Sequence, residues 1–301
     1  MRVLVTGGAG FIGSHLVDAL VDRGYDVIIV DDLSSGNNIN KGAEFFKRNI
    51  NSDLTDIFEK GIDYVFHLAA QIDLRSSLEF PVRDAETNVL GSLNVIECCL
   101  RYKVRKIIFS SSAAVYSGDC EIPINEDSEV NPWTPYGLGK LTIEKYLEIF
   151  KREFGLDYAV LRYSNVYGPR QRSDGEGGVM SIFINSALKG GDVKIFGDGS
   201  QTRDFIFVKD VVSANLFCVD NNLGGVFNVS TGKEVSVNGL AEAVRRETNS
   251  ISELVYFKEK DPGVLRSCLS YDKLKSFGWE IKYSFEEGLK ESVKWFKLFN
   301  N

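Results

Sequence analysis

The sequence predicts an α/β protein with a doubly wound parallel sheet and a smaller C-terminal α/β region. Two observations carry this prediction. Through the first half of the 301 residues, short apolar runs alternate with longer helical patterns, as parallel strands joined by helical crossovers require. In addition, Gly7, Gly10 and Gly13 lie between the first apolar run and the first helical pattern. A strand, a glycine-rich turn and a helix in this order are typical of a Rossmann-type sheet.

Each element follows from its own local pattern. Strands are expected near residues 2–6, 26–30, 45–46, 63–67, 106–110 and 157–162. Helical periodicity covers about 11–23, 78–101 and 135–153, the last of which starts at Pro135, a residue that favours a helix N-terminus. Beyond residue 165 the elements become shorter, and the chain ends in an amphipathic helix near 284–299.

The glycine-rich turn suits the pyrophosphate of a dinucleotide. Gly7 permits a sharp turn, Gly10 lets the backbone approach the phosphates, and Gly13 lets the helix pack closely on the strand. The helix N-terminus offers unpaired N–H groups and partial positive charge to the anion. Asp31 ends the second strand, where it can accept hydrogen bonds from the adenosine ribose. Because Asp31 and Asp32 together would repel a 2′-phosphate, we expect NAD rather than NADP.

The composition excludes several classes of protein. A net charge of −7 and a pI near 5.1 argue against a general binder of nucleic acids or anionic membranes. No apolar run approaches the roughly 18 residues of a membrane span, and a strand that starts at residue 2 leaves no room for a cleavable signal. The five cysteines lack paired metal-ligand spacing, and His15 and His67 are the only histidines. We therefore expect a cytoplasmic protein with reduced thiols and no metal site.

A second informative group of residues, made of serines, a tyrosine and a lysine, begins at the end of the fifth predicted strand. That strand ends in Ser110–Ser112, and Tyr136 and Lys140 lie four residues apart on the helix that comes next, so they point the same way. A nearby ammonium favours the phenolate form of tyrosine, whose usual pKa is about 10. A serine hydroxyl can then orient a substrate alcohol for proton transfer. The set therefore predicts removal of a proton from an alcohol.

The pattern Tyr-x-x-x-Lys is not specific by itself, because it also begins at Tyr102, Tyr256 and Tyr271. Position separates the four occurrences. Only Tyr136 begins a helix just after the fifth strand, with Ser112 at the end of that strand, whereas Tyr102 ends the preceding helix.

Six longer motifs run nearly from end to end of the chain: Thr6–Gly13, His67–Ala70, Ser110–Tyr116, Pro135–Lys140, Arg162–Arg170 and Gln201–Phe205. In content and order they resemble the extended short-chain dehydrogenase/reductases and, among these, the UDP-glucose 4-epimerases. The resemblance implies a domain over 1–165 that binds NAD, to which some later segments return. It implies a second domain over 166–301 that mainly binds a UDP-sugar.

The resemblance also implies the role of each site residue in the first domain. Tyr136 is expected to take the proton of the sugar 4-hydroxyl, Ser112 to hydrogen-bond to that hydroxyl, and Lys140 to hold the nicotinamide ribose. His67 is expected to be structural. The residues expected to bind NAD are Gly7, Gly10, Phe11, Ile12, Gly13, Asp31, Asp32, Leu33, Ser34, Ser35, Gly36, Asn49, Ile50, Leu68, Ala69, Ala70, Gln71, Asn88, Ser110, Tyr136, Lys140 and Tyr163.

Substrate-binding residues carry over in the same way. They are Ser112, Tyr136, Asn165, Val179, Phe196, Arg203 and Arg266. Arg203 suits a diphosphate as a forked donor with a permanent charge, although a surface ion pair with Asp204 is the alternative interpretation. Two departures from the family occur. Asn49 replaces the usual aspartate at the adenine amino group, and the usual acid after the glycine is missing from 261–266, where one residue is also deleted.

The opening oxidation at C4 is common to several reactions. Dehydratases of this family carry an Asp-Glu pair just after the strand-five serine or threonine, and decarboxylases keep a glutamate there. Ala113 and Ala114 stand at these positions and cannot move protons. This favours 4-epimerisation over 4,6-dehydration or decarboxylation. A protein that binds NAD without catalysis is the alternative of another class, which the intact Ser112, Tyr136 and Lys140 argue against.

Two further expectations follow from the resemblance. Small residues at Ser267 or Cys268, where some relatives carry a bulky one, predict that UDP-GlcNAc is accepted alongside UDP-glucose. The helices near 84–101 and 135–153 carry apolar residues beyond one core-facing stripe, which predicts pairing in a homodimer; the alternative is that both helices simply cover the sheet. These residues are Val89, Leu93, Ile96, Leu141, Tyr146 and Ile149.

Overall fold

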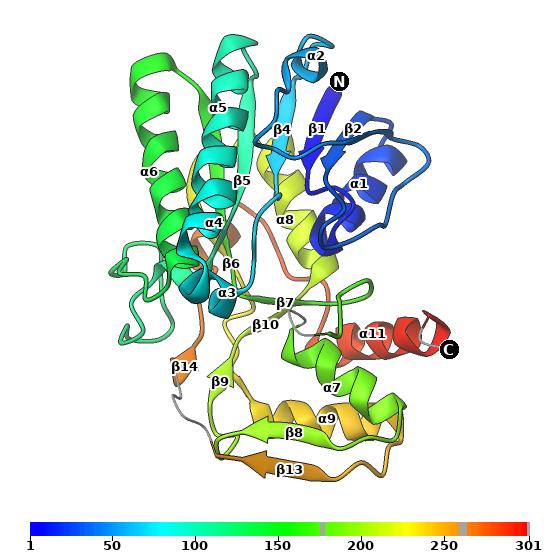
Figure 1. The fold of residues 1–301 in the computed structure, drawn as a ribbon. Coiled ribbons are helices and arrows are strands. Elements are labelled where there is room, and N and C mark those ends of the chain that lie inside the picture. Colours follow the sequence, from blue (N-terminus) through cyan, green and yellow to red (C-terminus); the bar gives the residue numbers. More distant parts are fainter. Residues whose placement is uncertain (175–177, 259–263, 300–301) are drawn as a thin grey trace. The chain divides into compact units, whose positions relative to one another are not determined.

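The computed structural model describes residues 1–174, 178–258 and 264–299 (Figure 1). The chain divides into two compact units, in each of which three segments distant in sequence come together. The first unit comprises Met1–Ser117, Glu129–Arg162 and Val212–Phe227. The second comprises Gly118–Ser128, Tyr163–Val211 and Asn228–Asn301.

A seven-stranded sheet forms the centre of the first unit, in the order β11-β6-β5-β4-β1-β2-β3. Its neighbours β3, β2, β1, β4 and β5 pair in parallel. Strand order reverses between β1 and β4, and ligands of doubly wound sheets bind at such a point, outside the carboxyl ends of the strands. The predicted fold class is confirmed. The strands are β1 (Arg2–Thr6), β2 (Asp26–Asp31), β3 (Glu44–Lys47), β4 (Tyr64–His67), β5 (Lys106–Ser112), β6 (Asp157–Tyr163) and β11 (Gly225–Val229).

The first six strands match the predicted ones closely because each is a short apolar run bounded by polar or turn residues. Strands buried on both faces read as continuous apolar runs, and Val3, Leu4 and Val5 of β1 are all fully buried. The seventh, β11, comes from a region where the sequence pattern is irregular, and it was not predicted as a separate element.

The helices of the first unit agree with the prediction at two of three places. They are α1 (Phe11–Asp22), α2 (Thr55–Phe58), α3 (Leu74–Glu79), α4 (Pro81–Ala85), the π-helical turn η1 (Glu86–Gly91), α5 (Ser92–Arg101), the short 3₁₀ turn η2 (Ala113–Val115) and α6 (Pro135–Phe154). Helices α1 and α6 confirm the expected ones. The helix predicted over 78–101 is confirmed from Pro81 to Arg101, where α4, η1 and α5 follow one another, but its predicted start is wrong, because Phe80 leaves helical geometry before Pro81.

One large part of the core of the first unit lies between the sheet and the helices α5 and α6, which pack side by side (Figure 1). Ile96 of α5 and Ile143 and Leu147 of α6 are fully buried in this core with Leu4 and Ile107 of the sheet. Ile96, expected on the outer face of its helix, is therefore a core residue, and Val89, Leu93 and Tyr146, expected there too, are partly buried and pack against the same core.

The second unit contains smaller sheets and four of the remaining helices. Its sheets have the orders β10-β7, β12-β9-β14 and β13-β8. Its strands are β7 (Asn165–Tyr167), β8 (Val193–Phe196), β9 (Thr202–Arg203), β10 (Phe205–Phe207), β12 (Val235–Ser236), β13 (Leu254–Phe257) and β14 (Arg266–Ser267). Its helices are α7 (Val179–Leu188), α9 (Val237–Thr248), α10 (Asp272–Ser276) and the expected C-terminal α11 (Phe285–Phe299), while α8 (Val208–Asp220) runs across the boundary into the first unit.

Candidate active site

The turn between β1 and α1 packs closely against neighbouring backbone. Gly7 has φ +70°, and a Cβ there would lie 2.7 Å from the amide nitrogen of Ala69. A Cβ on Gly13 would lie 2.1 Å from the carbonyl oxygen of Gly7. A Cβ on Gly36 would lie 2.6 Å from the carbonyl oxygen of Ala9, so the loop after β2 also approaches this turn closely. Side chains at these three positions would collide with backbone, so only glycine allows this close approach, and we call the turn the glycine cradle.

The N-terminus of α1 opens onto this cradle. Gly10 is the N-cap residue and offers no side chain to the first backbone N–H groups of the helix. Phe11 and Ile12, both predicted to bind NAD, are the first two residues of α1. Unpaired N–H groups at a helix N-terminus suit a pyrophosphate. The cradle and the helix end therefore fit the predicted dinucleotide.

Asp31 ends β2 and is anchored by the backbone. Its carboxylate accepts hydrogen bonds from the amides of Ala9 at 3.0 Å and Leu33 at 2.8 Å. Burial nevertheless raises its pKa above the usual range. These bonds join the end of β2 to the glycine-rich turn. Asp31, the predicted ribose contact, is therefore held in a fixed position relative to the predicted phosphate-binding turn.

Asp32 and Asn49 form the predicted adenine side of the site. The side-chain amide of Asn49 donates to Asp32 at 2.8 Å, and its oxygen accepts from the Asn51 backbone at 2.9 Å. Although burial opposes it, hydrogen bonds from Ser34 and Asn49 hold the pKa of Asp32 below its usual value. The Asn49 oxygen keeps one lone pair for an adenine amino group. Ile50, predicted beside it, is buried in the core.

The segment after β4 is held by Asn88. The Asn88 side chain accepts from the Gln71 amide and donates to the Gln71 carbonyl, both at 2.9 Å, which fixes Leu68–Gln71 at the sheet edge. Asn88 lies in the π-helical turn η1, and such turns often mark functional sites. Its position favours indirect support of the cofactor site through the Gln71 backbone.

His67 lies within β4 and is almost completely buried. Its Nδ1 is 2.7 Å from Thr6 Oγ1 and its Nε2 is 2.9 Å from Ser92 Oγ. Burial lowers the pKa of His67 to about 3, with the positive charge of Lys140 acting in the same direction. The imidazole is therefore neutral at ordinary pH and joins two strands to α5, as expected of a structural residue.

The Ser112, Tyr136 and Lys140 side chains come together at the carboxyl end of β5. Lys140 Nζ donates to the Ser110 carbonyl at 2.8 Å and lies 5.7 Å from the centre of the Tyr136 ring. It also lies 4.9 Å from the ring of Phe109. Helix α6 can start here because Pro135 occupies its first turn and Thr134 caps it through the Gly137 amide.

Burial controls the proton affinities of this set. It raises the pKa of Tyr136 to about 12, against the opposing effect of a hydrogen bond with Ser112. It lowers the pKa of Lys140 to about 8, against the opposing effects of Asp84 and Glu144. Lys140 is thus still mainly charged at neutral pH, whereas Tyr136 needs further positive charge nearby before it can act as a base.

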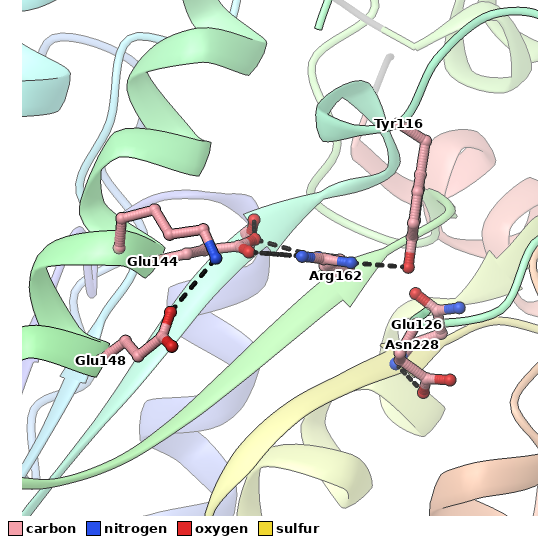
Figure 2. Close-up of polar contacts among 8 residues, drawn as sticks. Tyr116, Glu126, Glu144, Glu148, Arg162 and Asn228 are labelled. Carbon is pink, nitrogen blue, oxygen red and sulfur yellow. Dashed lines mark hydrogen bonds and ion pairs between the residues drawn. The ribbon is translucent and has the colours of Figure 1, made fainter. Parts of the chain in front are cut away.

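Three buried charged residues near this set were missed by the sequence reasoning. Asp84 accepts from the side chains of Asn88 at 2.9 Å and Gln71 at 3.1 Å. Glu144 and Arg162 form an ion pair of 2.6 Å (Figure 2). One signal was present for Glu144, which repeats the four-residue spacing of Tyr136 and Lys140 along α6. For Arg162 the signal was a charged residue directly after the buried apolar run Ala159–Leu161 of β6.

The predicted substrate residues of the second unit lie on separate elements. Asn165 begins β7 and is exposed, and Val179 is the first residue of α7. Phe196 ends β8, is 52% exposed and packs against Phe257 at 5.8 Å between ring centres. A cavity of about 960 Å³ lies at Phe257, the ring partner of Phe196, and is lined by Gly197, Asp198, Ser200, Gln201, Tyr256, Phe257, Lys258 and Leu265.

The two predicted diphosphate arginines differ in their surroundings. Arg203 Nη1 donates to the Thr202 carbonyl at 2.7 Å. Arg266 makes a forked ion pair with Glu234, at 3.0 Å and 2.6 Å. Glu234 therefore occupies one edge of the Arg266 guanidinium and competes with a phosphate for it. Asp204 is buried and accepts from the amides of Thr231 and Gly232. Residues 261–263, where the family motif departs, lie outside the described residues, and Tyr163 is buried at the end of β6.

Two kinds of site are absent from residues 1–174, 178–258 and 264–299. No group of three or more His, Cys, Asp or Glu side chains is placed to hold a metal ion there. The helices in the same residues are too short or too polar to cross a membrane.

Comparison with known proteins identifies the class. Residues 3–230 match the model of the NAD dependent epimerase/dehydratase family, and the chain belongs to that family. A crystal structure of UDP-glucose 4-epimerase from Thermotoga maritima with UDP-glucose is 45% identical, with 100% of both chains covered and a TM-score of 0.95. A UDP-glucose 4-epimerase from Mycolicibacterium smegmatis is 40% identical over 99% of both chains. The resemblance predicted from the motifs is confirmed, and NAD is the cofactor of the family.

A third similar protein acts on a related sugar. The structure of a UDP-N-acetylglucosamine 4-epimerase from Methanobrevibacter ruminantium M1, in complex with UDP-N-acetylmuramic acid, is 39% identical. It covers 99% of this chain and 98% of its own, with a TM-score of 0.94.

Proposed function

We propose that this protein is a UDP-glucose 4-epimerase, which interconverts UDP-glucose and UDP-galactose through a transient 4-keto sugar. The observation that carries the proposal is the position of Ser112, Tyr136 and Lys140 at the carboxyl edge of the sheet that also bears the glycine cradle. NAD, when bound, supplies the hydride acceptor at C4 and returns the hydride later, so no net oxidation occurs.

The chain's own residues carry the proton transfer. Tyr136 Oη takes the proton of the 4-hydroxyl, and Ser112 holds that hydroxyl within reach. The Lys140 ammonium, mainly protonated below its pKa of about 8, stabilises the phenolate form of Tyr136. Tyr136 returns the proton to the 4-oxygen when the keto sugar is reduced on its other face.

The residues after Ser112 favour epimerisation over the two related reactions. Ala113 and Ala114 form η2 at the position where dehydratases carry an acid and a base. Methyl groups cannot transfer the C5 and C6 protons that dehydration requires, and decarboxylases keep a glutamate at this place. These alanines leave only the C4 chemistry of Tyr136.

We also propose that the two units bind different ligands, NAD in the first and the UDP-sugar in the second. The residues proposed to bind NAD belong to the first unit, with the exception of Tyr163, whereas Asn165, Val179, Phe196, Arg203 and Arg266 belong to the second. A permanent, forked charge suits a diphosphate, and an exposed aromatic ring such as Phe196 suits a uracil. UDP is therefore held by the second unit, and the hexose is left free to turn.

Acceptance of UDP-GlcNAc rests on small residues near β14. Cys268 is buried, and its sulfur lies 3.8 Å from Asp204 Oδ2, so it is turned into the unit. Ser267 is only half-buried and is the better candidate for a residue that limits the sugar pocket. The similarity to a UDP-N-acetylglucosamine 4-epimerase supports this breadth.

We also propose a homodimer in the cytoplasm, serving galactose metabolism. Leu90, Leu138 and Ile149, on η1 and α6, are 58%, 56% and 41% exposed, which supports an apolar contact surface there. The five cysteines are free thiols, as in a reducing compartment. Light scattering after size-exclusion chromatography at several concentrations tests the dimer; a monomer throughout would contradict it.

The decisive experiment separates the three candidate reactions. Purified protein is incubated in turn with UDP-galactose, UDP-glucuronate and dTDP-glucose, and the products are identified by NMR. We expect UDP-glucose from UDP-galactose and no 4-keto-6-deoxy or pentose product. A Tyr136→Phe variant should lose turnover while still binding NAD. Dehydration or decarboxylation by the wild type, or NAD binding without any turnover, would overturn the proposal.

A further inference from the structure

Glu144 extends the face of α6 that carries the catalytic pair. Tyr136, Lys140 and Glu144 are spaced by four residues, so they stand one above another on the helix. Glu144 and Arg162 are 4% and 5% exposed. Arg162 holds the Glu144 carboxylate with two nitrogens, at 2.6 Å and 3.1 Å (Figure 2). A buried carboxylate fixed in this way cannot change position freely.

The same ion pair holds both ends of the segment that runs from Ser111, near the end of β5, to Tyr116. Ser111 donates its hydroxyl to Glu144 Oε1. At the other end, Arg162 Nη1 donates to Tyr116 Oη at 2.9 Å, and the guanidinium lies 4.8 Å from the Tyr116 ring centre (Figure 2). Between these ends lies Ser112, whose hydroxyl accepts from the Ala114 amide at 3.2 Å.

Ser111 stands between two residues that contact the catalytic pair. The Ser110 carbonyl receives Lys140 Nζ at 2.8 Å, and the Ser112 hydroxyl lies close enough to Tyr136 to lower the pKa of its phenol. A movement of Ser111 would therefore displace both partners. Displacements of about 1 Å in an active site can cost about a hundredfold in rate.

We propose that Glu144, fixed by Arg162, is a positioning residue for catalysis: through Ser111 it sets the places of the Ser110 carbonyl and the Ser112 hydroxyl. This inference rests on the proposed 4-epimerase function. Stability alone does not account for the pair, because buried ion pairs are often no more stabilising than apolar residues of similar size.

The charge of Glu144 also acts on Lys140 directly. The charged and titratable groups that face Lys140 are Asp84 from α4, His67 from β4, and Tyr136 and Glu144 from α6. His67 is neutral, so Asp84 and Glu144 are the two carboxylates that favour the ammonium form. Removal of the Glu144 charge leaves Asp84 alone, and Lys140 should then lose its proton at a lower pH.

The test uses Glu144→Gln, Ser111→Ala and their double variant, with Glu148→Gln as the matched control. Glu148 lies one turn further along α6, is exposed, and pairs with Lys145 at 3.1 Å (Figure 2). With UDP-galactose as substrate, we expect Glu144→Gln to lower kcat about tenfold or more with KM within about twofold. Its kcat should also fall off at lower pH on the alkaline side than that of the wild type.

Ser111→Ala should lower kcat at unchanged KM, and the double variant should be no slower than Glu144→Gln, because both act through one contact. The control Glu148→Gln should keep the wild-type kcat and the wild-type pH profile on the alkaline side. If Glu144→Gln behaves in the same way, the proposal is overturned. The proposal is also overturned if the fold-losses in kcat of the two single variants multiply in the double variant. If Glu144→Gln does not fold, Ser111→Ala decides: unchanged kcat overturns the proposal, and reduced kcat at constant KM supports it.

A wild-type protein that does not convert UDP-galactose would refute the proposed function without deciding the role of Glu144. That role is then read from Lys140 itself, by competitive acetylation from about pH 6 to about pH 10 and mass spectrometry of the Lys140 peptide. A lower titration midpoint in Glu144→Gln than in the wild type supports the proposal, and an unchanged midpoint overturns it.

Discussion

A Cβ atom on Gly13 would lie 2.1 Å from the carbonyl oxygen of Gly7. Real Cβ contacts almost never fall below 3.0 Å, and the atom in the way belongs to the backbone rather than to a flexible side chain. Helix α1 therefore packs on the turn as closely as it does only because residue 13 has no side chain. The same turn presents the helix N-terminus to the predicted pyrophosphate.

We accordingly expect Gly13→Ala to displace the turn and to weaken NAD binding by more than tenfold. Overpacking of this kind usually costs about 1–3 kcal/mol of stability as well. Calorimetric titration with NAD and thermal unfolding measure the two effects. The control is Gly191→Ala, where the nearest atom to a Cβ is the Ser186 Oγ at 3.4 Å, an ordinary contact. NAD affinity of Gly13→Ala equal to that of the control would contradict the assignment of this turn.

His67 should make the protein sensitive to acid. Its pKa is about 3 in the folded protein against 6.5 for an ordinary histidine. Below about pH 6.5 the unfolded chain binds a proton that the folded protein refuses, so the free energy of unfolding falls as the pH falls towards 3. The loss approaches roughly 1.4 kcal/mol per pH unit within this window.

Urea unfolding at a series of pH values checks this against His67→Gln, whose amide can still hydrogen-bond to Thr6 and Ser92. The variant should lose less stability than the wild type between about pH 6.5 and about pH 3. Above about pH 7 the difference between the two proteins should be constant, which serves as the internal control. Parallel pH profiles through the acid range would show that His67 is not the group responsible.

The sheet could be predicted from the sequence because its strands are buried on both faces and read as apolar runs. The break at Phe80 was missed because helical periodicity continues through 78–101, and only Pro81 signals the interruption. The seventh strand, β11, was missed for another reason. Its place in the sheet is decided by contacts with β6, a partner more than sixty residues earlier in the chain, which local pattern does not reveal.

The candidate site shows the same contrast between residues that the sequence could predict and residues that it could not. Ser112, Tyr136 and Lys140 could be proposed because their spacing places them on one strand end and one helix face. Glu144 and Arg162 were not singled out, because a glutamate in a helix is usually solvated. Their role depends on burial and on each other, and these become visible only when α6 and β6 are packed together.

The Arg266–Glu234 ion pair predicts that removal of an acidic side chain strengthens the binding of UDP. If Arg266 is a phosphate contact, Glu234 competes with the diphosphate for the guanidinium. Glu234→Gln should then strengthen UDP binding by a few fold, since exposed ion pairs are worth at most about 1 kcal/mol. Arg266→Ala should weaken UDP binding, and both effects are measured by titration calorimetry with UDP.

Arg203→Ala provides the comparison, because Arg203 is the more secure of the two proposed diphosphate contacts. It should weaken UDP binding whether or not Arg266 takes part, and NAD affinity should stay unchanged in all three variants. Weaker UDP binding by Glu234→Gln, or none of the expected loss in Arg266→Ala, would remove Arg266 from the substrate site and leave its pair with Glu234 as a surface contact of β14.

The breadth of substrate depends on Ser267. If the half-buried Ser267 borders the sugar pocket, a tyrosine there should fill the space needed by an N-acetyl group. Ser267→Tyr is therefore expected to lower kcat/KM for UDP-GlcNAc at least about tenfold more than for UDP-galactose, a difference of about 1.4 kcal/mol or more in transition-state binding. The control is Ser276→Tyr, which makes the same change at an exposed serine of α10. Equal loss for both sugars would indicate general damage to the site, and failure of the wild type to convert UDP-GlcNAc would refute the predicted breadth directly.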